Sequence, residues 1–83
     1  MEKGGKIMEN KKYKLILNIG YKNENVKYFD KLTKNRIKEI QENYNYIILY
    51  YDNLFGKYIW FDSGKVNDYQ KALFNSNLEY YCR

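Results

Sequence analysis

The chain has 83 residues, a length that suits one domain and not two. It carries a net charge of +5, 19% aromatic residues, one cysteine and no histidine. These numbers exclude an intrachain disulfide, the catalytic triads that need histidine as a base, and most zinc sites. No window approaches the ~18 consecutive apolar residues that span a bilayer, and a small domain without disulfides suggests a cytoplasmic protein.

The first ten residues hold two glycines and several charges without an apolar pattern. We therefore expect residues 1–10 to form a flexible leader and residues 11–83 to form a single domain. Apolar residues then occupy every odd position from 13 to 21, which predicts a half-buried strand. The polar turn residues that follow lead into a second strand over 26–30, with a helix beginning at Asn25 as the alternative.

In the strand interpretation, Tyr21 pairs with Val26. Thr33 then fits the N-cap of a helix. Ile37, Ile40 and Tyr44 follow at spacings of three and four, which predicts the apolar face of that helix.

A second hairpin is predicted from two strands that are apolar on both faces, at 46–52 and 57–62, joined by a four-residue turn. Its register sets Leu49 opposite Trp60, Tyr51 opposite Tyr58, Ile48 opposite Phe61 and Tyr50 opposite Ile59. A second helix is expected after an N-cap at Ser63, with Val66, Tyr69 and Leu73 on its apolar face. The Ser-x-x-Glu pattern at 76–79 predicts one last helical turn with a capping box.

The element order is thus strand, strand, helix, strand, strand, helix. It predicts a small α+β domain of ββαββα type, with a four-stranded, mainly antiparallel sheet and both helices packed on one face.

Acidic side chains are the remaining candidates for acid–base or metal chemistry. Asp30, Asp62 and Asp68 lie near the expected helix starts, where carboxylates commonly offset the helix dipole. We favour that structural role over a metal site. The protein is therefore predicted not to be an enzyme and to carry no catalytic residues, no cofactor and no metal ion.

One face of the second hairpin is the first candidate binding surface. Two short helices on one side of the sheet leave the other side bare, and exposed aromatic area of that extent indicates an interaction site. Tyrosine and tryptophan are enriched in protein interfaces, so a protein partner is expected at Leu49, Tyr51, Tyr58 and Trp60. The alternative is that the hairpin is covered on both sides.

A basic surface is the second candidate. Residues 1–38 carry a net charge of +7 and residues 39–83 a net charge of −2. Contacts to phosphate without sequence readout are expected at Lys27, Lys31, Lys34, Arg36 and Lys38. A compositional origin competes with this interpretation, because 47 of the 83 residues are Asn, Lys, Ile, Tyr or Phe, all of which have AT-rich codons.

We therefore expect a non-catalytic binding protein that acts stoichiometrically on a larger nucleic-acid-handling complex. Small size, missing motifs and codon bias suit a phage or mobile-element product, for example an inhibitor of a host defence nuclease such as a CRISPR effector. The alternatives are a regulator that binds DNA or RNA directly and a homodimeric structural subunit. No membrane partner is expected.

Overall fold

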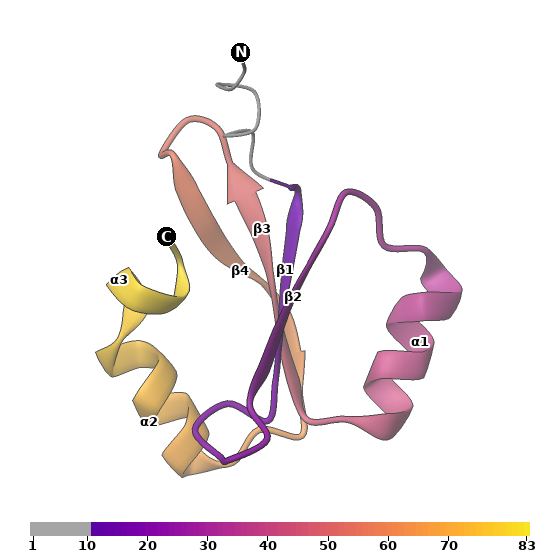
Figure 1. Cartoon of the computed structure of the whole chain (residues 1–83), viewed down its shortest axis with the longest axis vertical. Coiled ribbons are helices and arrows are strands. Elements are labelled where there is room, and N and C mark those ends of the chain that lie inside the picture. The colour runs from indigo at the N-terminus through magenta and orange to yellow at the C-terminus, as the bar shows by residue number, and fades with distance from the viewer. Residues whose placement is uncertain (1–10) are drawn as a thin grey trace.

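A computed structural model describes residues 11–83 as one four-stranded antiparallel sheet with three helices (Figure 1). The strand order is β2-β1-β3-β4, so the first strand lies inside the sheet and β2 and β4 form its edges. The α+β class and the ββαββα order are confirmed. The flexible leader predicted at residues 1–10 lies outside the described residues. The elements are β1 (Tyr13–Leu17), β2 (Asn25–Phe29), α1 (Lys34–Asn43), β3 (Tyr46–Asp52), β4 (Lys57–Gly64), α2 (Asp68–Ser76) and α3 (Leu78–Tyr81).

The helices cover opposite faces of the sheet. Seen edge-on in Figure 1, α1 lies on one side and α2 with α3 on the other. Leu15 of β1 packs in a core cluster with Ile40 of α1, whereas the adjacent Ile16 packs in a second cluster with Phe74 of α2. Neighbouring residues of a strand point to opposite faces, so both faces are buried. The predicted placement of both helices on one face is wrong.

The helices lie on opposite faces because β1 is buried on both of its faces. Its alternation of apolar and polar residues predicts one buried face, but Lys14 is itself buried and all four residues from Lys14 to Leu17 are in the core. Because β1 and β3 are the central strands, each needs cover on both sides, and a helix on either face supplies it.

The register of the first hairpin also differs from the prediction. Val26 pairs with Ile16 and not with Tyr21, because β1 ends at Leu17 and the chain turns at Asn18, whose φ is +54°. The longer loop is held by Glu24, whose Oε1 accepts a hydrogen bond from the Gly20 amide at 2.7 Å.

The second hairpin follows its predicted register near the turn, where Leu49 pairs with Trp60, Tyr51 with Tyr58 and Tyr50 with Ile59. Further from the turn the register shifts by one residue, and Ile48 pairs with Asp62 in place of Phe61. Such a bulge inserts one extra residue into β4 and bends that strand.

The caps were predicted with mixed success. Thr33 caps α1 as expected, since its Oγ1 accepts the Arg36 amide at 3.2 Å. Helix α2 is capped by Asn67 and not by Ser63, because β4 continues to Gly64. The last helical turn exists as α3, but the capping box predicted at 76–79 is wrong: Asn77 is its N-cap and makes no side-chain cap bond.

A polar network inside the core joins α2 to the β1–β2 loop. Gln70 is 0% exposed. Its Nε2 donates to the Ile19 carbonyl at 3.0 Å and to Asn45 Oδ1 at 3.2 Å, and its Oε1 accepts the Asn67 amide at 3.0 Å. The reciprocal bond from the Gln70 amide to Asn67 Oδ1 completes a capping box. Every polar atom of this buried side chain is thereby used, as buried amides require.

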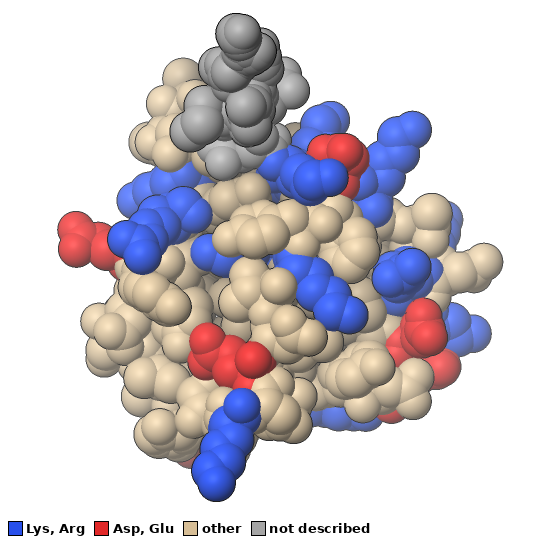
Figure 2. Space-filling model, viewed as in Figure 1, with Lys and Arg blue, Asp and Glu red and all other residues tan. Residues whose placement is uncertain are grey.

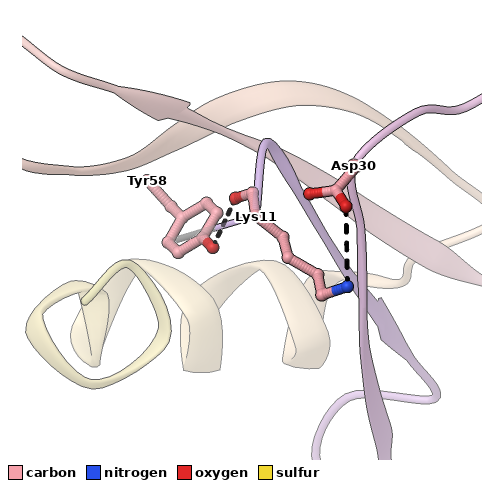
Figure 3. A network of polar contacts seen from close by, with 3 residues as sticks. All are labelled: Lys11, Asp30 and Tyr58. Carbon is pink, nitrogen blue, oxygen red and sulfur yellow. Dashed lines mark hydrogen bonds and ion pairs between the residues drawn. The ribbon is translucent and has the colours of Figure 1, made fainter. Parts of the chain in front are cut away.

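A smaller set of contacts fixes the start of the described chain (Figure 3). The Tyr58 hydroxyl donates to the Lys11 carbonyl at 2.7 Å, and the Lys11 ammonium lies 3.6 Å from the Asp30 carboxylate. The ion pair is exposed and contributes little to stability. The hydrogen bond ties Lys11, two residues before β1, to strand β4.

Candidate functional site

The four residues predicted to face a protein partner lie on the side of the sheet that α2 and α3 cover. Leu49 and Tyr58 are buried in that core cluster and Tyr51 packs against it. Only Trp60 is exposed, at 58%. The expectation of a bare face is therefore wrong for Leu49 and Tyr58 and largely so for Tyr51, because the helices are divided between the two faces. Trp60 remains a candidate contact.

The hairpin nevertheless exposes a large apolar surface through other residues. Thirteen large apolar side chains are exposed among the described residues, and six of them fall between residues 50 and 61. We call this set the hairpin patch: Tyr50, Leu54, Phe55, Ile59, Trp60 and Phe61. The concentration of exposed apolar area on one hairpin marks it as the leading candidate for an interaction surface.

Part of the hairpin patch lies on the α1 side of the sheet, beyond the area that the helix covers. Tyr50 and Ile59 are cross-strand partners there, and Phe61 lies nearby with ring centroids 6.5 Å apart from Tyr50. Tyr13 of β1 joins them, at 5.4 Å from the Tyr50 ring and 5.7 Å from the Phe61 ring. Tilted and edge-on contacts of this kind hold aromatic rings in fixed positions.

The tip of the hairpin is shaped by Asp52. Its Oδ1 accepts the amides of Leu54 at 2.8 Å and Phe55 at 3.4 Å, and the Gly56 amide donates to its carbonyl at 2.8 Å. These bonds fold the turn and leave Leu54 and Phe55 pointing into solvent. Large apolar side chains on an ordered turn lose little entropy on binding a partner.

Several features of β4 protect its edge from forming a sheet with strands of other molecules. The Tyr58 amide, which points away from β3, donates to the Cys82 carbonyl at 2.7 Å. The bulge next to Leu49 interrupts the regular edge, and Trp60 Nε1 donates to Ser63 Oγ at 3.3 Å. Covered amides and bulges are common protections of edge strands. The side chains of β4 are thus better placed than its backbone for contacts with a partner.

A cavity of about 580 Å³, open to solvent, lies between the edge of β4 and α3. Its apolar lining includes Trp60, Phe74 and Leu78, and Lys57, Glu79 and Arg83 also border it.

Two of the five predicted phosphate-binding residues line one cavity. Lys27 and Arg36 are brought together in a cavity of about 280 Å³ between β2 and α1, where Glu39 supplies an opposite charge and Arg36 lies 5.5 Å from the Phe29 ring. Lys31, Lys34 and Lys38 are exposed and do not border that cavity. On the face drawn in Figure 2, basic side chains are spread among uncharged ones.

The acidic candidates have structural partners. Asp30 pairs with Lys11, and Asp62 accepts the Tyr46 hydroxyl at 2.9 Å and Gln41 Nε2 at 3.3 Å. Burial, and then the hydrogen bond to Asp62, raises the pKa of Tyr46. Asp68 lies in the first turn of α2, where it offsets the helix dipole. Within residues 11–83, no three Asp, Glu, Cys or His side chains are grouped to hold a metal ion.

The one cysteine of the chain, Cys82, is a poor nucleophile. Cys82 is buried, and burial raises the pKa of its thiol, which disfavours the reactive thiolate.

Comparison with protein-family models, with curated proteins and with solved structures finds no match to this chain. Across the described part of the chain, no helix has the length and apolar character needed to cross a membrane.

Proposed function

We propose that this protein is a non-catalytic binding module that docks on a larger protein through the hairpin patch. The observation that carries the proposal is the exposure of Ile59, Trp60 and Phe61, three consecutive large apolar residues on an edge strand. Consecutive residues of a strand point to alternate faces. A partner that binds β4 therefore contacts apolar side chains on both sides of the hairpin.

Protein is a better partner for this patch than single-stranded nucleic acid. Stacking of bases needs cations interleaved with the aromatic rings, to contact the phosphates. Lys57 is the one basic residue between positions 46 and 64, and Asp52 and Asp62 flank the patch. Aromatic side chains with few charges among them are typical of the core of a protein interface.

The partner that we propose is a complex that handles nucleic acid, and the protein acts on it stoichiometrically. The support is the net charge of +5, most of it in the first half of the chain, which allows the bound protein to lie close to phosphates. Inhibition of a host defence nuclease, by a phage or mobile-element product, is the specific form of this proposal. Its support is the small size of the chain and a composition rich in residues that have AT-rich codons.

Affinity capture with the purified chain as bait tests the docking surface. The variant Trp60→Ser removes an exposed apolar residue of the patch, and Phe61→Ser removes a second. The matched control is Tyr69→Ser, because Tyr69 of α2 is 57% exposed, nearly the same as Trp60 at 58%, and lies outside the hairpin. We expect the captured partner to be lost with the patch variants and retained with the control.

The result that contradicts the proposal is loss of the partner by Tyr69→Ser to the same degree as by Trp60→Ser. A salt titration separates the alternative of direct DNA or RNA binding. Neutralising several phosphates makes affinity fall by about 10³-fold or more between ~50 and ~200 mM salt, whereas a mainly apolar interface predicts a shallow dependence.

A further inference from the structure

Lys14 is a buried cation, and among residues 11–83 it has no acidic partner. It is the second residue of β1, one of the two central strands, and is 5% exposed. Its Nζ donates to the Tyr81 carbonyl at 2.6 Å and lies 5.7 Å from the Tyr28 ring and 5.6 Å from the Tyr58 ring. In the described part of the chain, no carboxylate lies within ion-pair distance of this amine. Burying a charge without a counter-ion costs free energy, and such buried charges are rare in proteins.

Among residues 11–83, one hydrogen bond uses a donor of the Lys14 ammonium. A lysine side chain offers three N–H donors, and one of them is used by the Tyr81 carbonyl. The two tyrosine rings stabilise the charge through their electron-rich faces but accept no conventional hydrogen bond. Burial lowers the pKa of Lys14 from its ordinary value, as expected for a cation that is poorly compensated.

The amine borders a small cavity on the α3 side of the sheet. This cavity has a volume of about 250 Å³, and its lining contains two cations and no acidic side chain: Lys14, Val26, Tyr28, Tyr80, Tyr81 and Arg83. The Arg83 guanidinium lies 5.1 Å from the centre of the Tyr80 ring, and both residues line the cavity. The closest acid in the hydrogen-bond network is Glu24, and its Oε1 is already bonded to the Gly20 amide and the Tyr81 hydroxyl.

We propose that this cavity is a binding site for a small aryl oxyanion, a phosphate or carboxylate group attached to one aromatic ring. Lys14 and Arg83 contact the oxyanion, and Tyr28 and Tyr80 form the walls for the ring. A volume of 250 Å³ is below the range typical of drug-sized ligands, which is about 300–1,000 Å³, so it suits one ring and one charged group. Arginine contributes a planar fork for two oxygens and lysine contributes a point charge.

This site goes beyond the proposed function and does not depend on it, because its residues lie outside the hairpin patch. The competing explanation of Lys14 is purely structural: the amine caps the carbonyl end of α3. That explanation predicts no ligand, so direct binding measurements separate the two.

Isothermal titration calorimetry with phenyl phosphate and with benzoate provides the test, and benzyl alcohol serves as the uncharged control. We expect saturable binding of at least one of the two anions and none of benzyl alcohol. Removing a charge-assisted hydrogen bond weakens affinity by about tenfold or more, and this loss is expected for Lys14→Met and for Arg83→Gln. Lys71→Met removes the same charge from an exposed position outside the cavity and is expected to leave the affinity unchanged.

Arg83→Gln keeps the test decisive if Lys14→Met does not fold, since Arg83 is exposed. The proposal is overturned if neither anion binds at millimolar concentration, or if benzyl alcohol binds as well as they do. It is also overturned if Arg83→Gln and Lys71→Met have equal effects.

Discussion

Replacing Gln70 by leucine tests the polar network that joins α2 to the sheet. The substitution keeps the volume of the side chain and removes its three hydrogen bonds. The Ile19 carbonyl, on a residue that is 1% exposed, loses its Nε2 donor. An unsatisfied buried acceptor costs about 1–3 kcal/mol.

The other two bonds of Gln70 cost less to lose. Asn45 Oδ1 keeps the amide of Asn18 as a donor at 3.0 Å, and the Asn67 amide belongs to an exposed residue that water can reach. Together they add about 1 kcal/mol, so the expected loss is about 2–4 kcal/mol. A domain of this size has a free energy of unfolding of about 5–10 kcal/mol. A loss of 3 kcal/mol lowers Tm by about 12–24 °C.

Urea unfolding followed by circular dichroism measures this loss. The matched control is Gln41→Leu, because Gln41 is exposed and makes one side-chain hydrogen bond, to Asp62 at 3.3 Å. Its effect is expected to stay within about 0.5 kcal/mol. If Gln70→Leu costs less than about 1 kcal/mol, the network is not what holds α2 on the sheet.

Three further predictions concern single sites. Gly20→Ala is expected to cost about 1–3 kcal/mol in urea unfolding, because φ is +84° and the new Cβ would lie 2.6 Å from Leu73 Cδ2. Burial, and then the Glu24 carboxylate, raises the pKa of Tyr81 to about 12. The unfolded value is about 10, so this stabilisation is complete below pH 10 and lost as the pH rises toward 12; Tyr81→Phe should flatten that fall. Thr33→Ala removes the α1 cap and should cost about 1 kcal/mol.

The sequence predicts the order of elements because hydrophobic periodicity and turn residues are local signals. The register near the second turn follows from the four residues between Asp52 and Lys57, and it is confirmed. The division of the helices between two faces was missed, because a lysine in an alternating strand indicates a solvent-facing position. Only a tertiary contact, here with the Tyr81 carbonyl, makes the burial of Lys14 tolerable.

The hairpin that the sequence indicated does expose apolar side chains, but of the four residues predicted there only Trp60 is exposed. Once both faces of the sheet are covered, exposure depends on how far each helix extends, and α1 leaves Tyr50, Ile59 and Phe61 bare. The bulge that pairs Ile48 with Asp62 has no local sequence signal. The apolar character of both faces of β4 was visible in the sequence and was the one signal for these residues.

The central position of β1 has a consequence during synthesis of the chain. Strand β1 pairs with β3, and the carbonyl that accepts the Lys14 amine lies 67 residues further along. Contacts between distant residues form slowly. While translation continues, Ile16, whose core cluster includes Phe74 and Tyr81, therefore remains without its final neighbours, and an apolar strand in that condition tends to associate with other chains. The nascent protein is thus most prone to aggregate before α3 has emerged from the ribosome.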